Sequence, residues 1–291
     1  MNSVPISFER FEYKYWLNLA QEEALLQCLA TFMRRDAMAP GGQQNTSLYL
    51  DSEELDFFTL HVDKTPDRPK LRVRAYGNPP SGKAFFEIKR KIKRVCFKDR
   101  ATVPMNMVPK LLRGEIPAEF VLRPEERKIL DHFLYLMYVW NATPKLLITC
   151  KREAFTSILP DEGVRLTLDR QICYQPMYEP TLLGDPKAWI SLCGQMHYQP
   201  EAPTLCEIKF RNMAPVWIAD MVQGLKLRLA ASSKYVMAMR LDSTGGDSPE
   251  MTDPFVPPSL KSRVVQQAGG VNSAGGILPC RALVTGIVTA G

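Results

Sequence analysis

Charged residues recur at every second position in several segments that otherwise contain apolar residues. In AFFEIKRKIKRVCFKDR, residues 84–100, Glu87, Lys89 and Lys91 share one phase, with Lys98 and Arg100 following after a break. Alternate side chains of a β-strand point to opposite faces, so this segment predicts a strand with one charged face. Such a face either contacts water or lines a barrel that binds a polyanion, and a charge run alone favours water.

The same alternation in other segments favours the barrel interior. The charged residues that share a phase are Arg10, Glu12 and Lys14; Arg72 and Arg74; Arg165 and Asp169; and Glu207 and Lys209. Unpaired buried charge is very costly, so converging cations need an anion that carries many charges. Arginine binds phosphate oxygens bidentately and lysine supplies a point charge. The pattern therefore predicts a triphosphate or polyphosphate ligand, with the few carboxylates holding a bridging divalent cation.

Composition sets limits on the class of protein. The chain has 291 residues, of which 45% are hydrophobic and 23% charged, and a net charge of +6, as in ordinary globular proteins. It shows no apolar leader and no run of 18 apolar residues, so we expect a cytoplasmic protein without a transmembrane segment. The basic residues alternate along strands and are not interleaved with exposed aromatic residues, and nucleic acid is therefore not an expected partner.

The order of the predicted elements indicates one large domain and a tail. Strands are expected at 8–17, 46–52, 70–77, 84–100, 144–155, 164–174 and 204–210, and helices at 18–35 and 214–239. Residues 104–143 predict a helical insertion. From residue 243 the chain is rich in Gly, Pro and small residues, which is typical of a disordered tail. We therefore expect a domain at 1–242 and a tail at 243–291.

Eight short segments occur in an order that resembles one family. They are RFEYKY (10–15), SLYLDS (47–52), KLRVRAY (70–76), FFEIKRKIKRVCFKDR (85–100), KREAF (151–155), GVRLTLDR (163–170), LCEIKF (205–210) and SSKYVMAM (232–239). Together they resemble the VTC domain, the polyphosphate polymerase module of the vacuolar transporter chaperone complex. This family belongs to the triphosphate tunnel metalloenzymes, with the CYTH-like proteins. The resemblance implies an α+β fold, a closed antiparallel β-barrel with surrounding helices and a helical insertion.

The resemblance also implies an activity and a set of residues. The expected activity transfers the γ-phosphoryl group of ATP to a growing polyphosphate chain, with Mn²⁺ or Mg²⁺. The implied metal ligands are Glu207, Glu12 and Glu87, and the implied catalytic residues are Arg72, Arg74 and Lys234. The residues implied to bind phosphate are Lys14, Arg72, Arg74, Lys89, Lys91, Lys98, Arg100, Arg152, Arg165, Lys209 and Lys234.

One departure from the wider superfamily bears on the reaction. Hydrolytic CYTH relatives begin with ExExK, whereas this chain has Arg10, Glu12 and Lys14, so a cation replaces one carboxylate. A more basic tunnel favours retention of a long anionic product over hydrolysis. Two alternatives stay open: a metal-dependent tripolyphosphatase or nucleoside triphosphatase, and a non-catalytic polyphosphate-binding module. The sequence does not indicate the oligomeric state, and a membrane partner protein is compatible with it.

Overall fold

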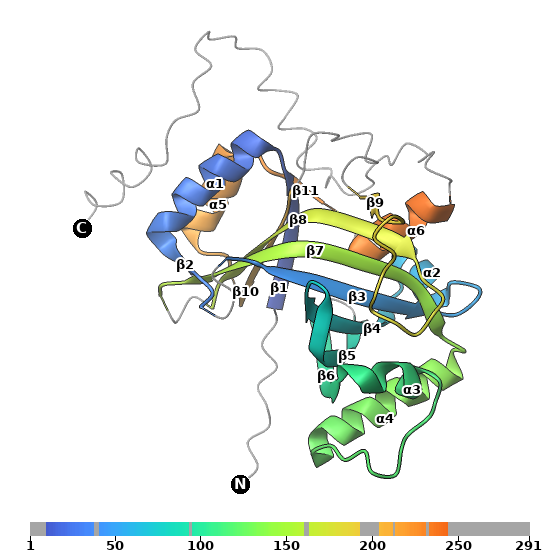
Figure 1. The fold of residues 1–291 in the computed structure, drawn as a ribbon. Coiled ribbons are helices and arrows are strands. Elements are labelled where there is room, and N and C mark those ends of the chain that lie inside the picture. The colour runs from blue at the N-terminus through green and yellow to red at the C-terminus, as the bar shows by residue number, and fades with distance from the viewer. Residues whose placement is uncertain are drawn as a thin grey trace, which may run out of the picture.

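A single antiparallel sheet positions the charged residues. The computed structural model describes residues 10–37, 41–92, 95–159, 163–192, 204–211, 213–230 and 233–243, so nearly all of the predicted tail lies outside the described residues. The sheet has 11 strands in the order β11-β1-β10-β8-β7-β3-β4-β5-β6, with β2 paired to β7 and β9 paired to β8 (Figure 1).

The strands and helices have the following bounds. The strands are β1 (Arg10–Leu17), β2 (Met33–Arg35), β3 (Gln43–Asp51), β4 (Asp67–Gly77), β5 (Pro80–Ile92), β6 (Val95–Pro104), β7 (Thr143–Ser157), β8 (Arg165–Pro176), β9 (Ile190–Ser191), β10 (Thr204–Arg211) and β11 (Arg228–Leu229). The helices are α1 (Leu19–Phe32), α2 (Asp56–Val62), the 3₁₀ turn η1 (Met105–Met107), α3 (Val108–Leu112), α4 (Pro124–Val139), α5 (Val216–Gly224) and α6 (Lys234–Ser243). None of the described helices is both long and apolar enough to cross a lipid bilayer.

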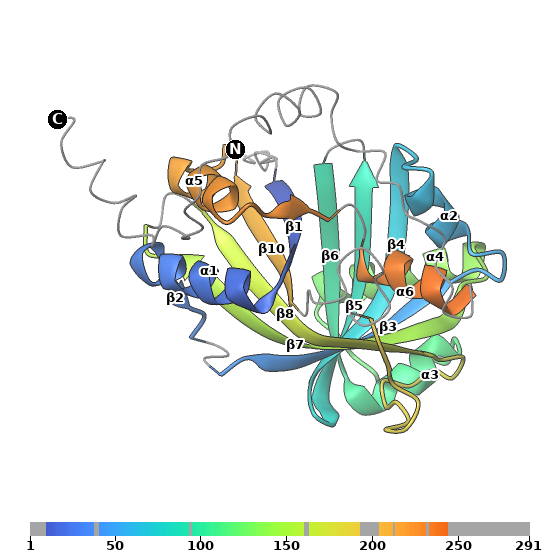
Figure 2. The ribbon, with the colours of Figure 1, turned by 90° about the horizontal axis from the view of Figure 1, so that it is seen from above.

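The sheet curls on itself, but it does not close into the predicted barrel. Within the described residues, the chain of paired strands ends at β11 and at β6, and no backbone pairing joins these ends. The free edge of β1 is partly occupied by β11, which pairs with Tyr15 and Trp16. A side-chain contact brings the two sides together instead, because Lys89 of β5 lies 3.5 Å from Glu12 of β1. The prediction of a closed barrel is therefore wrong, although the curled sheet still has an inner and an outer face (Figure 2).

Two helical layers cover the outer face of the sheet. Helices α3 and α4, which lie in the segment predicted as a helical insertion, pack against β4, β5 and β6 through residues such as Val73, Phe86 and Phe133. Helices α1 and α5 cover β1, β8 and β10, with Leu166 and Ile208 buried beneath them. The alternating apolar residues of these strands thus face helices, and their charged neighbours face inward.

Helix α6 packs against the inner face near one end of the sheet. Tyr235 stacks on Tyr49 of β3 with ring centroids 5.0 Å apart, and the same buried cluster contains Trp16 and Leu205. Trp16 shares its strand face with Lys14, and Leu205 shares its face with Glu207. The inner face is therefore apolar where α6 packs on it and charged around Lys234, the first residue of α6.

The predicted helix at 214–239 is interrupted. Its residues form α5, the short strand β11 and the start of α6. Leu229 and Arg228 pair with β1, so a long-range strand pairing replaces helical hydrogen bonds in the middle of the segment. The helix predicted at 18–35 likewise ends at Phe32, because Met33–Arg35 pairs with β7. The interruption allows α6 to turn onto the inner face, where Lys234 contacts the strands.

The attachment of α4 to the sheet can be tested at Phe86. Its ring is fully buried and meets Phe133 of α4 edge-to-face, with centroids 4.9 Å apart. Phe86→Ala leaves a cavity between the layers, and we expect it to lower the free energy of unfolding by ~3–5 kcal/mol. Urea denaturation measures this change. Val121→Ala, at a side chain that is 83% exposed, should change it by less than ~0.5 kcal/mol; a similar loss in both variants would contradict the packing described.

Candidate functional site

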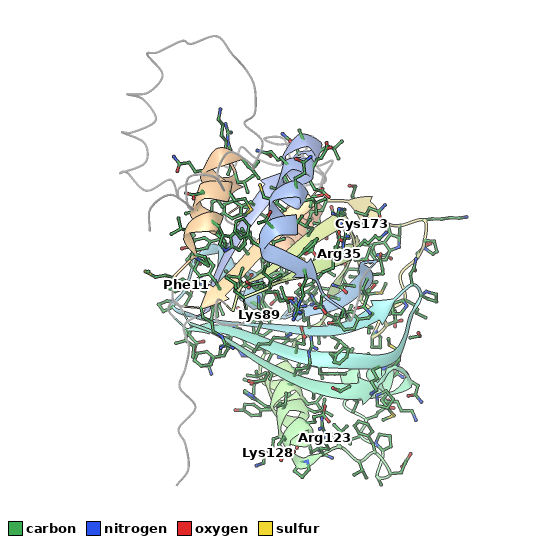
Figure 3. All side chains as sticks on the ribbon, turned by 90° about the vertical axis from the view of Figure 1, so that its left-hand side faces the viewer. Phe11, Arg35, Lys89, Arg123, Lys128 and Cys173 are labelled. Atoms are coloured by element: carbon green, nitrogen blue, oxygen red, sulfur yellow. The ribbon has the colours of Figure 1, made fainter. Side chains whose placement is uncertain are left out.

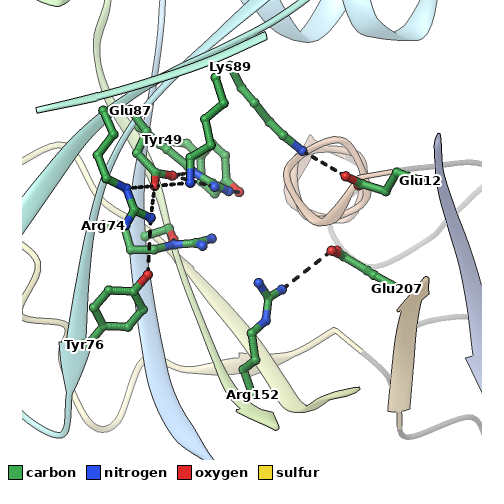
Figure 4. Close-up of polar contacts among 12 residues, drawn as sticks. Glu12, Tyr49, Arg74, Tyr76, Glu87, Lys89, Arg152 and Glu207 are labelled. Carbon is green, nitrogen blue, oxygen red and sulfur yellow. Dashed lines mark hydrogen bonds and ion pairs between the residues drawn. The ribbon is translucent and has the colours of Figure 1, made fainter. Parts of the chain in front are cut away.

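Strand register places most of the predicted site residues on the inner face. Glu12 and Lys14 of β1 lie opposite Lys209 and Glu207 of β10. On the other side of the sheet, Arg72 lies opposite Glu87 and Lys70 lies opposite Lys89. We call this surface the lumen face. Figure 4 shows its two groups of side chains pointing toward one another from opposite strands.

The first group surrounds the carboxylates of Glu207 and Glu12. Glu207 Oε1 lies 3.1 Å from Lys234 Nζ, and Glu207 Oε2 lies 3.0 Å from Lys209 Nζ and 3.8 Å from Arg152 Nη2. Glu12 lies 2.9 Å from Lys14, 3.5 Å from Lys89 and 3.8 Å from Lys209. Burial alone would raise the pKa of both carboxyl groups, but the neighbouring ammonium and guanidinium groups outweigh burial and lower it. Both side chains are therefore carboxylates at neutral pH.

Asp169 belongs to this group, although it was not among the predicted site residues. Its side chain is fully buried; it accepts two hydrogen bonds from Arg152, each at 2.5 Å, and lies 2.5 Å from Lys234. Burial opposes ionisation, but Arg152 and Lys234 lower the pKa of Asp169 from 3.8 to about 2. Asp169 thus orients Arg152 and Lys234 toward Glu207. Asp169 is four positions after Arg165 in β8 and therefore lies on the same strand face. This spacing could have identified it from the sequence.

The second group surrounds Glu87. This carboxylate lies 2.6 Å from Arg72 and 2.7 Å from Lys98, and it also pairs with Arg100. Arg72 donates a further hydrogen bond to the hydroxyl of Tyr49 at 3.1 Å. Glu87 is therefore surrounded by three cations and is separate from the pair formed by Glu12 and Glu207. It serves as a counterion that holds Arg72 in place.

Arg74 differs from Arg72 because its guanidinium has no carboxylate partner among the described residues. Its Nε donates to the hydroxyl of Ser47 at 3.0 Å, and the residue is only 9% exposed. Burial, followed by repulsion from Arg72, lowers the pKa of this guanidinium. An arginine stays charged even so, so Arg74 is a buried cation that no carboxylate of the described residues pairs with.

The lumen face as a whole carries more positive than negative charge. In the described part of the chain, the two groups together with Arg74 and Lys70 combine ten basic side chains with four carboxylates, an excess of six positive charges. The basic residues are Lys14, Lys70, Arg72, Arg74, Lys89, Lys98, Arg100, Arg152, Lys209 and Lys234, and the acidic ones are Glu12, Glu87, Asp169 and Glu207. Buried cations require anions, so this surface is suited to a ligand with several negative charges.

Two residues predicted to bind phosphate lie at the margins. Arg165 is on the correct strand face, but its guanidinium pairs with Asp36 at 2.9 Å and its side chain is 44% exposed. Lys91 lies beyond Lys89 on β5, opposite Arg68. Lys70 and Tyr49 are lumen residues that sequence reasoning missed. Lys70 was predictable in principle, because it precedes Arg72 by two positions.

Comparison with known protein families shows the family to which this chain belongs. The family model of the VTC domain matches residues 9–241, which is most of the chain. The chain belongs to the VTC domain family. Among curated proteins, no sequence matches this VTC domain.

Several solved structures are similar to the VTC domain at low sequence identity. A protein from Pyrococcus horikoshii OT3 is 13% identical with a TM-score of 0.40, covering 79% of this chain and 98% of that chain. A putative adenylate cyclase from Vibrio parahaemolyticus is 12% identical with a TM-score of 0.41, covering 80% and 98%. A putative adenylate cyclase from Bacillus halodurans is 11% identical with a TM-score of 0.40, covering 77% and 95%.

The acidic residues of the VTC domain fit a divalent cation only if the ligand also contributes oxygens. The described residues contain no cluster of three or more metal-ligating side chains. Glu12 and Glu207 nevertheless share one cation, because Lys209 lies 3.8 Å from the first and 3.0 Å from the second. Mg²⁺ commonly binds one or two carboxylates together with substrate phosphates. The pair therefore fits such an ion, whereas Glu87 is enclosed in its own ion pairs.

The Asp169 ion pairs predict a pH-dependent stability. The folded-state pKa of Asp169 is lowered from 3.8 to about 2, so its contribution is present above pH 4 and is lost as the pH falls toward 2. We expect Asp169→Asn to lower the free energy of unfolding by at least ~2 kcal/mol at pH 7. This difference from wild type should shrink as the pH falls from 4 to 2, as measured by urea denaturation across pH.

A surface ion pair provides the control for this experiment. Asp67 pairs with Arg90, and both side chains are nearly half exposed. Asp67→Asn should therefore differ from wild type by less than ~1 kcal/mol at every pH. A pH-independent difference for Asp169→Asn would contradict the role assigned to its carboxylate.

Proposed function

We propose that this VTC domain is an ATP-dependent polyphosphate polymerase that transfers the γ-phosphoryl group of ATP to a polyphosphate chain on the lumen face. The observation that supports this proposal best is the excess of six positive charges among the two groups of residues on that face together with Arg74 and Lys70. Family membership agrees with it. Phosphoryl transfer depends on positioning and charge stabilisation, which fixed cations supply.

Each group of residues has a role in this reaction. Arg74 has no carboxylate partner among the described residues, so its guanidinium is available to bind phosphoryl oxygens bidentately. Arg72 is held by Glu87 and Tyr49, and Lys234 by Asp169 and Glu207, so both present their charge in fixed positions. A divalent ion held by Glu12 and Glu207 would neutralise charge on the triphosphate.

The bond changes need no proton acceptor from the protein. An anionic oxygen at the end of the acceptor chain forms the new bond to the γ-phosphorus atom. The bond between that phosphorus and the oxygen bridging to the β-phosphate breaks, and ADP leaves with the electron pair. Because the acceptor oxygen is already anionic at neutral pH, no side chain has to remove a proton from it.

The protonation behaviour of the carboxylates favours this reaction over hydrolysis. Hydrolysis is assisted by a general base that accepts a proton from water. Glu12, Glu87, Asp169 and Glu207 each have a lowered pKa, since nearby cations outweigh the effect of burial. They are weak proton acceptors as a result. A tripolyphosphatase or nucleoside triphosphatase is therefore the second candidate, and a non-catalytic polyphosphate-binding module is the third.

The decisive experiment incubates the purified protein with ATP and Mn²⁺ and separates the products. We expect long polyphosphate and ADP from wild type. Glu207→Gln removes one carboxylate at nearly constant volume, so we expect it to abolish the Mn²⁺-dependent reaction while circular dichroism stays unchanged. Orthophosphate without polymer would support the hydrolase, and binding without turnover would support the third candidate. Wild-type turnover and Mn²⁺ dependence in Glu207→Gln would show that the ion lies elsewhere.

Arg74 provides a separate test of the cationic lumen. Loss of a charge-assisted contact to phosphate costs about 1.5–3 kcal/mol, which corresponds to a decrease in rate of roughly 10- to 150-fold. We expect Arg74→Ala to reduce polymer synthesis by at least ~10-fold at saturating ATP. Arg74→Lys should recover only part of this loss, because an ammonium cannot bind two oxygens in the same planar geometry.

ADP release and polymer length are measured for both Arg74 variants. Arg113, an exposed arginine that pairs with Glu115, gives a matched control, and Arg113→Ala should retain wild-type turnover. A folded Arg74→Ala that makes polymer at the wild-type rate would refute the role of Arg74.

A further inference from the structure

Asp51, the last residue of β3, is a buried carboxylate that the proposed reaction does not use. It is fully buried, and in the described part of the chain no cation forms an ion pair with it. Its oxygens accept hydrogen bonds from the backbone N–H groups of Ser52, Phe57 and Phe58 at 2.8–2.9 Å. They also accept one from the hydroxyl of Tyr235 at 2.5 Å. One carboxylate therefore joins the end of β3, the first turn of α2 and the first turn of α6.

The apolar contacts of α6 do not define its rotation about its own axis. Its buried residues are Tyr235, Val236, Met237, Ala238, Met239 and Leu241. Five of these are consecutive, so they surround the helix and do not form a single apolar stripe. Burial of apolar surface has no preferred direction. A helix that is apolar on all sides needs a directional contact to select one rotation.

Two hydrogen bonds supply direction at the start of α6. Ser233, which precedes the helix, accepts from Lys70 at 2.7 Å, and this contact fixes where the helix begins. The bond from the hydroxyl of Tyr235 to Asp51 is the second fixed point. A carboxylate only accepts hydrogen bonds, so the hydroxyl must point at it. The stack of Tyr235 on Tyr49, with ring centroids 5.0 Å apart, is less directional and allows the rings to slide.

The rotation of α6 decides where Lys234 lies. Lys234 and Tyr235 are consecutive, so their side chains leave the helix ~100° apart. With Tyr235 turned toward Asp51, the ammonium of Lys234 lies 2.5 Å from Asp169 and 3.1 Å from Glu207. A rotation of the helix moves the end of this long side chain farther than it moves the backbone. Loss of the fixed point at Tyr235 therefore displaces the ammonium from both carboxylates.

We propose that Asp51 and Tyr235 are positioning residues: their hydrogen bond sets the rotation of α6 and thereby places the ammonium of Lys234 on the lumen face. Neither residue contacts the phosphate in this role. The inference rests on the proposed function, because it assigns Lys234 a contact with a phosphoryl group. It requires that the hydroxyl of Tyr235 affects the ligand only through Lys234.

A double-mutant cycle tests this requirement. Isothermal titration calorimetry measures the affinity of the full chain for tripolyphosphate, without ATP or metal. We expect Tyr235→Phe to weaken binding by at least ~5-fold and Lys234→Met by ~10-fold or more. When Lys234 is already methionine, adding Tyr235→Phe should change the affinity by less than ~2-fold, because the group that the hydroxyl positions is absent.

The same titrations separate positioning from a general loss of structure. A variant that is partly unfolded binds with a lower stoichiometry, whereas its folded molecules keep their affinity. We expect Tyr235→Phe to change the dissociation constant at unchanged stoichiometry. Turnover of ATP should follow the same pattern: kcat at saturating ATP falls with Tyr235→Phe alone, and falls no further when it is combined with Lys234→Met.

Matched variants control for each change. Tyr174 is buried in the same cluster, and its hydroxyl forms no hydrogen bond with another residue in the part of the chain that the structure describes. Tyr174→Phe should therefore bind as wild type does. Lys128 of α4 is exposed on the far side of the sheet (Figure 3), so Lys128→Met controls for the loss of one charge.

A second variant keeps the test valid if Tyr235→Phe does not fold. Asp51→Glu retains the carboxylate but moves it by one methylene group, which shifts the fixed point of α6. It should weaken tripolyphosphate binding in the presence of Lys234 and have less than a ~2-fold effect in Lys234→Met.

Wild-type affinity in Tyr235→Phe, or losses that add to those of Lys234→Met, would overturn the positioning role. Absence of tripolyphosphate binding by the wild type would overturn both this inference and the proposed function. A wild type that binds tripolyphosphate but makes no polymer from ATP would refute the polymerase alone, because the binding cycle still reports on Lys234.

Discussion

Buried positive charge that the protein itself does not neutralise is the constraint on which the rest of the structure depends. Arg74 and Lys70 lie inside the curled sheet without carboxylate partners among the described residues, and neither is freely exposed. Such groups cost stability, so the remaining structure must offset them. The two outer helical layers bury the opposite face of the same strands, and Glu87 and Asp169 hold neighbouring cations at fixed positions.

The four lumen carboxylates act mainly as counterions in this arrangement. Each is shared between at least two cations, as Glu207 is between Lys234 and Lys209. Shared ion pairs restrict the long side chains of these cations before a ligand arrives. These side chains therefore lose less conformational entropy when a ligand binds. The stability of the ligand-free protein and its affinity for a polyanion are therefore opposed. Further carboxylates would stabilise the empty lumen and weaken its affinity for phosphate.

Local periodicity explains what the sequence could predict. The inward positions of Arg72, Arg74, Lys89 and Glu207 follow from the two-residue period of a strand, which is a property of neighbouring residues. The partners of these residues depend on contacts between distant segments. Asp169 meets Lys234 only because α6 turns onto the inner face, and that turn follows from the pairing of β11 with β1. Closure of the sheet was mispredicted for the same reason, because it depends on whether β11 and β6, the strands at the two ends of the order, pair with each other.

The register between β4 and β5 limits how this part of the chain can change in length. Val73 contacts the helical layer while Arg72 and Arg74 face inward, and each residue has one partner on β5. Deleting a single residue within β4 would exchange the two faces, placing guanidinium groups against α4 and valine in the lumen. Deleting two residues would preserve the faces and shorten the row of cations. Length variation that keeps the fold should therefore occur in steps of two within this hairpin, or be confined to its turn.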